Sequence, residues 1–379
     1  MEEWKECKLE EISKNITDGT HSTVIDDISG NYFLLSCKNV KNGIIQISNS
    51  ERKINKETFE KLRKRTKLEK DDILVTTVGT IGEMAIITDH NPHYEFQRSV
   101  GIIKPNKDIV DPKFLYYSLK NELPQIMNRT LGAVQQCLFL GDIKQLSIKL
   151  PPLPSQQKIA AILSSLDNKI ELNNKINTNL EQQAQALFKN WFVDFEPFGD
   201  KMPEEWKVGK LSDIAEITSG KRPPMKQSDF SKDVSIPLVG AASVMGYTNQ
   251  VLYNEPILIT GRVGTHGVIQ RFSTECWPSD NTLVVKSQYY EYVYQIMCNI
   301  DYDNMNRGST QPLITQSDLG KVECIIPDEE NLNKFEQLAS ILFSKFHENQ
   351  QENQKLTNIR DTLLPKLMNG EIDLEIFQI

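Results

Sequence analysis

The sequence of 379 residues lacks the features that mark membrane, secreted and disulfide-rich proteins. Its longest apolar runs, such as residues 160–163, are far shorter than the roughly 18 residues that a membrane-spanning helix requires. The first residues, MEEWKECKLEE, include no apolar stretch, so we expect no signal peptide. The six cysteines form no CxxC pair and no metal-like spacing, which predicts reduced thiols in a cytoplasmic protein.

An excess of basic residues is also missing. Lys and Arg number 43 against 51 Asp and Glu, giving a formal net charge of −8. Phosphate contacts require Lys and Arg, so this total at first argues against a nucleic-acid partner. The charge is unevenly distributed, however: residues 193–205 carry −4 and residues 369–379 carry −3, whereas residues 1–153 carry +1 and residues 206–327 carry −1. The globular parts are therefore nearly neutral, which leaves room for a local positive face on each.

No catalytic or metal-binding motif is present in the sequence. The glycine loops at residues 78–82 and 262–267 are not followed by a helical pattern, as a dinucleotide site would require. The five histidines are not clustered in a metal pattern, although His90 and His93 are close together. Asn91-Pro92-His93-Tyr94 is similar to the Asn-Pro-Pro-Tyr of amino-methyltransferases, but its third residue is His and no glycine-rich cofactor loop precedes it. We therefore predict a loop there, and neither a catalytic centre nor a metal site.

The chain contains an internal repeat. EEWKECKLEEI, from residue 2, returns as EEWKVGKLSDI from residue 204, and VGTIG (78–82) returns as VGTHG (263–267). The tripeptide at 127–129 returns at 305–307, and residues 135–151 match residues 311–327. Four matches in the same order indicate a duplication. The first copy is longer, mostly before the glycine loop, where it carries the basic segment 52–67.

Each copy ends in a long helical pattern, at residues 154–192 and 328–368. Ser155 is the expected N-cap of the first helix, and Pro327-Asp328 is expected to open the second, which should end or kink near Pro365 with Gly370 as C-cap. Apolar residues recur at steps of three and four in both. The expected stripes include Ile159, Ile162, Leu166, Leu180 and Leu187 in the first helix, and Leu338, Leu342, Leu356, Ile359 and Leu363 in the second.

The two stripes must be buried, and the two helices are of similar length. We predict that they pair as an antiparallel coiled coil, in which the central polar residues Asn173 and Asn349 fix the register. The alternative is that each helix packs on its own globular part. We favour the pair because both stripes are longer than one face of a small domain needs.

The globular parts contain short β-branched runs separated by Gly, Asn, Asp and Pro, at residues 43–47, 73–77, 99–104, 257–260 and 282–286. One amphipathic helix is expected near residues 111–121. The predicted fold class is α+β: two similar β-rich globular domains, separated by two long helices that form an antiparallel coiled coil, with internal duplication and pseudo-two-fold symmetry.

Four stretches of this sequence give it a family resemblance. They are PPLPSQQKI from Pro151, SLDNKI from Ser165, LFKNWFVDF from Leu187 and LLPKLMNGEI from Leu363. Together with the order of domains and helices, they make the chain similar, end to end, to the specificity subunits of type I restriction–modification enzymes.

The resemblance implies that residues 1–153 and 206–327 are two target-recognition domains, each binding half of a split, asymmetric DNA site. Helices 154–192 and 328–368 would space them, joined by an acidic linker (193–205) and followed by an acidic tail (369–379). Two modification subunits, which bind S-adenosylmethionine, and restriction subunits, which use ATP and Mg²⁺, would be the protein partners. The resemblance implies no cofactor in this chain, no catalysis by it and no membrane partner.

The candidate DNA-binding residues lie on loops that the two copies place alike and in the basic segment. Arg can bind guanine and Gln can bind adenine through paired hydrogen bonds. Phosphate contact and a solvated helix face are both open for the basic segment. The candidates are Thr20, His21, Ser22, Arg52, Lys53, Arg63, Lys64, Arg65, Thr77, Thr80, Arg129, Gln135, Lys221, Arg222, Arg262, Thr265, Arg307, Ser309, Thr310 and Gln311.

Two other classes of function are alternatives to a DNA-specificity subunit. A duplicated adaptor that binds protein or carbohydrate would show no salt-sensitive DNA binding. A free-standing adenine methyltransferase would bind S-adenosylmethionine by itself and would lose it on Asn91→Ala.

Overall fold

The computed structural model describes residues 4–130, 138–305 and 313–377, and of residues 124–130 it describes the backbone only. The chain forms two compact units. The first combines Met1–Leu172 with Glu352–Ile379, and the second is Asn173–Gln351. No helix within the described residues is long and apolar enough to span a membrane.

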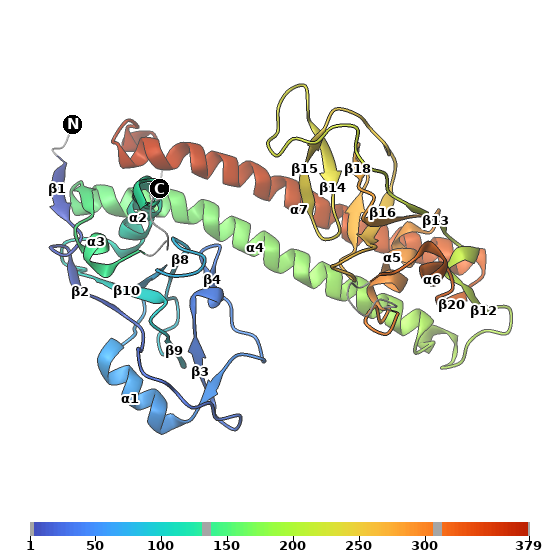
Figure 1. Ribbon diagram of the computed structural model, residues 1–379, viewed down its shortest axis with the longest axis horizontal. Helices are drawn as coiled ribbons and strands as arrows, with labels where there is room; N and C mark the ends of the chain where they lie inside the picture. The colour runs from blue at the N-terminus through green and yellow to red at the C-terminus, as the bar shows by residue number, and fades with distance from the viewer. Residues whose placement is uncertain (1–3, 131–137, 306–312, 378–379) are drawn as a thin grey trace. The chain divides into compact units, whose positions relative to one another are not determined.

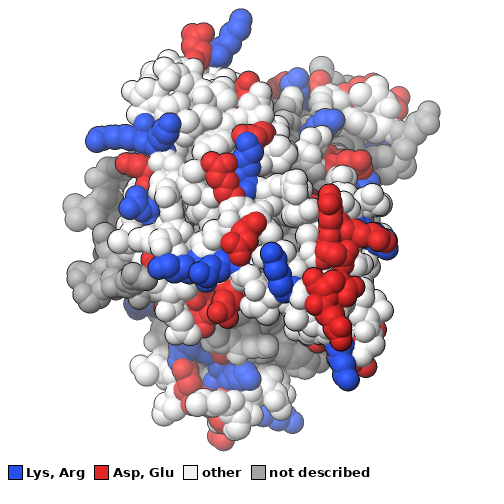
Figure 2. All heavy atoms as spheres, turned by 90° about the vertical axis from the view of Figure 1, so that its right-hand side faces the viewer, with Lys and Arg blue, Asp and Glu red and all other residues white. Residues whose placement is uncertain are grey.

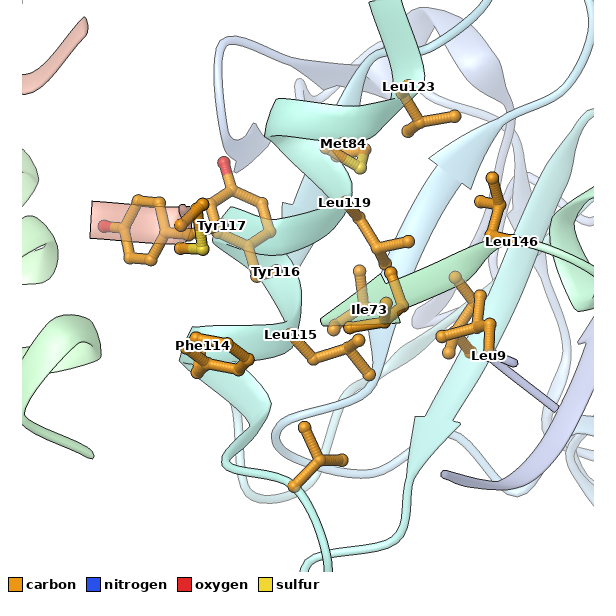
Figure 3. Packing of buried hydrophobic residues seen from close by; sticks show 14 of the residues in the cluster. Leu9, Ile73, Met84, Phe114, Leu115, Tyr116, Tyr117, Leu119, Leu123 and Leu146 are labelled. Carbon is orange, nitrogen blue, oxygen red and sulfur yellow. The ribbon is translucent and has the colours of Figure 1, made fainter. Parts of the chain in front are cut away.

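The first unit is built on a four-stranded antiparallel sheet with the order β2-β10-β7-β8. These strands are Ser13–Asp18, Val100–Pro105, Ile73–Thr76 and Met84–Ile86. Helix α2 (Pro112–Thr130) covers one face of the sheet, where Phe114, Leu115 and Leu119 pack with Ile73 (Figure 3). Leu74 faces the opposite side and packs in a second core with Phe96. The central strand is thus buried on both faces, which explains its uninterrupted apolar sequence.

Smaller elements complete the first unit. A second sheet, β6-β3-β9, comprises Lys53–Ile54, Tyr32–Leu35 and Tyr94–Phe96, and it is joined by the basic helix α1 (Lys56–Thr66). Strand β1 (Lys5–Lys8) pairs antiparallel with β11 (Ser147–Leu150), the last strand before the first long helix. The short hairpin β4–β5 (Val40–Lys41, Ile44–Ile45) and helix α3 (Leu140–Lys144) are also present.

The second unit repeats this frame. Its sheet has the order β13-β19-β16-β17, formed by Glu216–Ser219, Thr282–Lys286, Ile257–Gly261 and Gln270–Phe272. Strand β12 (Lys207–Lys210) pairs with β20 (Glu323–Ile326), as β1 pairs with β11. Helices α5 (Tyr290–Cys298) and α6 (Gln316–Gly320) stand where α2 and α3 stand in the first unit, and a small sheet holds β14 (Ile236–Val239), β15 (Val244–Thr248) and β18 (Trp277–Pro278). The common strand order confirms the predicted duplication.

Two helices of 40 residues, α4 (Leu153–Phe192) and α7 (Glu329–Met368), contribute to both units (Figure 1). In the first unit Asp167 pairs with Arg360 at 2.7 Å and Lys169 with Glu352 at 3.4 Å. In the second unit the Asn349 side chain donates to Asn177 Oδ1 at 2.8 Å. Numbers rise along one helix as they fall along the other, so the predicted antiparallel pairing is confirmed.

The seam between the helices differs in detail from the predicted stripes. Ile159 and Ile162 are buried, and Leu166, Leu180, Leu187, Leu342, Leu356 and Leu363 are partly buried. Leu338 and Ile359, however, are 45% and 47% exposed, and the adjacent Ala339 is fully buried instead. A pattern of large apolar residues does not reveal Ala339, because the second unit has a small residue at this buried position.

The start of α4 differs from expectation, whereas both ends of α7 agree with it. Helix α4 begins at Leu153 rather than after Ser155, because Pro154 is tolerated in a first turn, where its missing N–H costs nothing. Asp328 caps α7 as expected, accepting from the Asn331 backbone N–H at 3.0 Å. Helix α7 continues through Pro365 and ends at Met368, the last residue of the predicted helix, and Gly370 follows with the positive φ of a C-cap glycine. The buried Leu364, Leu367 and Met368 hold this last turn in place.

Candidate nucleic-acid interface

Three loops of the first unit meet at the same end of its sheet, where strands β2 and β7 end and β10 begins. They are Gly19–Ser22 after β2, Thr77–Gly82 after β7, and Arg98–Ser99 before β10, and we call them the first recognition edge. The Thr20 backbone N–H donates to the Phe96 carbonyl at 2.8 Å, and the Arg98 N–H donates to the Thr20 carbonyl at 3.0 Å. The Thr77 N–H donates to the Ser99 carbonyl at 2.9 Å. These backbone bonds fix which side chains stand at the edge.

The second unit has the same arrangement at the equivalent edge, formed by Gly220–Arg222, Arg262–Gly267 and Asn281, which we call the second recognition edge. The Lys221 N–H donates to the Pro278 carbonyl at 3.0 Å, and the Arg262 N–H donates to the Asn281 carbonyl at 2.8 Å. Lys221 therefore occupies the position of Thr20, and Arg262 the position of Thr77. The backbone frame is shared while the side chains at equivalent positions differ.

A glycine is required at the same place on both edges. A Cβ added to Gly19 would lie 2.1 Å from the Phe96 carbonyl oxygen, and one added to Gly220 would lie 2.1 Å from that of Ser279. Both neighbours are backbone atoms that cannot move aside cheaply. The close approach keeps the following residue, Thr20 or Lys221, at a fixed distance from the adjacent strand.

Asp18 brings several of the predicted residues of the first edge together. Its carboxylate contacts His21 Nε2 at 2.6 Å and accepts from Arg65 Nη2, also at 2.6 Å. Arg65 Nη1 donates to the Gly19 carbonyl at 2.7 Å. The loop Thr20–Ser22 and the end of the basic helix α1 are thus joined, and Lys64 is exposed beside Arg65.

Other candidates of the first unit are turned inward or occupied. Arg63 pairs with the buried Glu95 and donates to the carbonyls of Leu68, Pro92 and Tyr94. Its guanidinium holds α1 to the domain, and a contact between Arg63 and DNA stays a prediction.

Thr77 is also buried, with its hydroxyl directed at the Arg98 carbonyl, so only the neighbouring Thr80 is exposed. Arg52 is engaged by Asp26 at 2.6 Å and by the Val24 carbonyl, and Lys53 lies in strand β6.

The second edge contains a group of polar atoms whose hydrogen-bonding capacity is unmet among the described residues. Arg262 Nε and His266 Nε2 are buried without a hydrogen-bond partner, and the buried hydroxyls of Thr260 and Tyr302 beside them interact with each other. His266 Nδ1 lies 3.0 Å from the Gly261 carbonyl, which can only accept, so Nδ1 is the donor of this hydrogen bond. Buried polar groups without partners are unfavourable, so stability does not explain this cluster.

Lys221, Arg222 and Thr265 are exposed at the second edge, as predicted for residues that contact a ligand. The Trp277 indole N–H donates to the Lys221 carbonyl at 2.8 Å and so holds the start of this loop. Arg98 and Tyr302 were missed. Arg98 was recoverable in principle, because it is a basic residue directly before the predicted strand 99–104, whereas nothing near Tyr302 in the sequence marks it.

Some predicted residues lie outside the described part of the chain. Gln135, Arg307, Ser309, Thr310 and Gln311 belong to this group. Arg129 lies in α2, where the side chain is not described.

The described residues contain no cluster of three or more His, Cys, Asp or Glu that could hold a metal ion. In the sequence Asn91-Pro92-His93-Tyr94, the first and third side chains are exposed. The Tyr94 hydroxyl donates to Asp89 at 3.2 Å, and the Pro92 carbonyl accepts from Arg63. These residues form the turn that leads into β9 and hold α1. Figure 2 shows acidic and basic side chains intermixed over the face that it views, with acidic side chains gathered on one side.

Comparison with known proteins identifies the repeated frame. The model of the family described as "Type I restriction modification DNA specificity domain" matches residues 1–182 and again residues 203–360. The chain belongs to this family. Its two matched segments correspond to the two copies found in the sequence, and the chain is a non-catalytic DNA-specificity subunit.

Relatives of this specificity subunit match it over nearly its whole length. It is 29% identical to the type I restriction enzyme MjaIX specificity subunit of Methanocaldococcus jannaschii, over 98% of this chain and 94% of that one. It is 27% identical to the HindI specificity subunit of Haemophilus influenzae, over 98% and 100%. The crystal structure of a type I restriction–modification S subunit from M. genitalium shares the fold, with 18% identity, a TM-score of 0.62 and coverage of 97% and 96%. Neither alternative, adaptor or methyltransferase, is favoured.

Proposed function

We propose that each recognition edge binds one half of a split, asymmetric double-stranded DNA target. The observation that carries this proposal is the hydrogen-bonding frame common to the two edges, with Lys221 and Arg262 in one where Thr20 and Thr77 stand in the other. A common frame with different side chains gives two modules one docking geometry and two sequence preferences.

The chemistry of the two edges suggests different preferences. Arg262 is a donor that can make paired hydrogen bonds to guanine O6 and N7, and Lys221 can donate to the same acceptors. The first edge offers hydroxyl groups and an imidazole, at Thr20, Ser22 and His21. Its cationic group is the exposed Arg98, and Lys64 and Arg65 lie beside the edge on α1, in a position to contact phosphate.

We further propose that the paired helices α4 and α7 set the spacing of the half-sites and dock two modification subunits, with restriction subunits joining for cleavage. Forty residues of helix correspond to about 60 Å.

Large apolar side chains that the helix seam leaves exposed, Leu338 and Ile341 on α7 and Leu172 on α4, support a protein partner on these helices. S-adenosylmethionine would be bound by the modification subunits, and ATP and Mg²⁺ by the restriction subunits, so that this chain itself needs no cofactor.

The proposal is tested by mapping methylated adenines in cells that express the chain with its modification subunit. With the intact chain we expect a bipartite motif that disappears when the chain is omitted. Arg262→Ala should relax one or two base pairs in one half-site and leave the other half-site unchanged, because a lost bidentate contact removes about 1–3 kcal/mol of discrimination.

The matched control is Lys286→Ala. Lys286 is an exposed cation at the opposite end of strand β19. It should leave the motif intact. An unaltered motif in Arg262→Ala, or equal relaxation of both half-sites, would contradict the assignment of the second edge to one half-site.

A further inference from the structure

The duplication gives every layer of the α4–α7 seam a counterpart. Through the two helices the copies align at a constant offset of 176, which matches Lys158 with Lys334, Asn173 with Asn349 and Leu180 with Leu356. Because the helices are antiparallel, each contact in the first unit has an equivalent contact in the second unit. The α4 residue of the first contact corresponds to an α7 residue of the second, and the α7 residue corresponds to an α4 residue. The residues at these equivalent contacts can therefore be compared directly.

The layer that contains Asp167 differs most between the units. In the first unit Asp167 Oδ1 lies 2.7 Å from Arg360 Nη1, and its other oxygen accepts from the Tyr117 hydroxyl at 2.6 Å. The Arg360 side chain is only 15% exposed, so the pair is largely withdrawn from water. The counterparts in the second unit are Phe343 and Ala184, which are 5% and 0% exposed and belong to one apolar core. One unit uses opposite charges and the other uses a large and a small apolar residue.

The adjacent layer shows the same complementarity in size. Leu163 and Leu364 belong to the core of the first unit. Their counterparts in the second unit, Ala339 and Phe188, belong to its core and again combine a small residue with a large one. In both layers the division of side-chain volume between the two helices differs from one unit to the other.

Pairing of like copies would break these layers. Two helices of the first copy would place Asp167 opposite Ala184 and leave Arg360 out of reach, so that the partly buried carboxylate loses its cation. They would also set Leu163 against Phe188, which overfills the layer.

Pairing between two copies of the second-copy helix, α7, would be equally unfavourable. Arg360 would face Phe343, whose ring is already covered by the Arg271 guanidinium at 3.8 Å, so two cations would share one aromatic face. Ala339 would lie opposite Leu364, which leaves a gap where Phe188 now packs.

We propose that these layers form a pairing code, by which the spacer helix of each copy selects the helix of the other copy and rejects a second copy of itself. The central asparagine layer does not discriminate, because asparagine occupies residues 173 and 177 and their counterparts 349 and 353 alike. It fixes register, while Asp167, Arg360 and the unequal residues beside them fix the choice of partner. This inference concerns the internal interface and does not depend on which DNA the chain binds.

The test uses the full chain with a protease site inserted in the exposed linker at Gly199–Lys201. After folding and purification the linker is cut, and the two fragments are allowed to exchange with isotope-labelled fragments in moderate urea. Native mass spectrometry then counts unlike and like pairs. The code predicts unlike pairs at about tenfold or more above random assortment. Random assortment, or a majority of like pairs, would overturn it.

Two variants separate the code from general stability. Asp167→Phe with Arg360→Ala gives the first unit the residues of the second, and like pairs should rise toward random assortment. Lys169→Ala, which removes the half-exposed ion pair between Lys169 of α4 and Glu352 of α7, should leave the count unchanged.

A measurement on the uncut chain covers the case in which the fragments do not exchange. Asp167→Arg and Arg360→Asp should each lower the urea midpoint, and the double variant should recover most of the loss. Additive losses would show that the two residues do not act as a matched pair.

Discussion

Glu336 shows how a single residue can connect a recognition domain to a helix. It lies on α7, and its carboxylate accepts from the backbone N–H groups of Tyr292 at 2.8 Å and Glu291 at 3.1 Å, in the first turn of α5. Burial raises the pKa of Glu336 to about 7, against the effect of these two N–H groups. In the unfolded chain the pKa returns to its ordinary value near 4.5.

The sign of the pH dependence follows from this raised pKa. Below about pH 4.5 both states hold the proton, and between pH 4.5 and 7 only the folded state holds it. The free energy of unfolding therefore falls as the pH rises through this window, by up to about 3 kcal/mol.

Glu336→Gln should remove that part of the pH dependence, because glutamine keeps the shape and an acceptor oxygen but does not ionise. Urea unfolding at pH 5 and at pH 8 measures the difference. Glu330→Gln, on the exposed face of the same helix, is the control and should behave as the unmodified chain does. Equal pH slopes in the unmodified chain and in Glu336→Gln would contradict the assignment.

Arg63 and Arg65 show why the sequence predicted the site only in part. Both lie in the same basic helix, and their chemistry is identical. Their roles differ because Glu95, 32 residues away from Arg63 in the sequence, is buried beneath one face of α1 and draws Arg63 inward. The loops that form the recognition edges followed from the repeat, but the direction of each side chain depends on contacts distant in sequence.

At the scale of elements, the long helices were the most predictable part of the fold, because a stripe maintained over many turns indicates a helix whatever its partner. The prediction for Leu338 was wrong because the residues on the facing helix determine which side chain is buried. Ala339 is buried in place of Leu338 because larger residues surround it. Helix α5 was missed, because its nine residues are fewer than the roughly 10–12 over which a helical pattern can be told from a buried strand.

The role of the helices as a spacer predicts the result of a matched insertion. Four residues added beside Asn173 in α4 and beside Asn353 in α7 lengthen each helix by about 6 Å and nearly preserve its phase. The unspecified spacer of the methylated motif should then grow by one or two base pairs, with both half-sites unchanged. The measurement is a methylation map of the variant. An unchanged spacer would refute the role of the helices as a ruler, and an insertion in the exposed linker 193–205 is the control that should alter nothing.

At the scale of the whole molecule, the charge distribution matters more than its total. The linker and the tail hold −7 of the net −8, so the rest of the chain is almost neutral. A neutral subunit gains little from phosphate contacts, and we expect its partners to supply much of the positive surface.

The isolated chain should therefore bind its target at least about tenfold more weakly than the complex with modification subunits, and its affinity should depend less on salt. Fluorescence anisotropy at several salt concentrations measures both quantities. Equal affinities and equal salt slopes would show that the chain supplies the phosphate contacts by itself. Lys64→Ala is an internal check, because a phosphate contact from α1 would reduce the salt slope by about one.

The first unit joins the beginning of the chain, Met1–Leu172, to its end, Glu352–Ile379, whereas the second is a single continuous segment. The ribosome therefore releases every part of the second unit before the last helical turns that the first unit needs. Leu364, Leu367 and Met368 complete the core around Phe114 and Leu163, and Trp4 packs beside Gly370. The domain made first stays incompletely packed until residues 352–379 have been synthesised. Premature termination within residues 352–379 should thus destabilise the first unit and spare the second, which is translated later than most of the first.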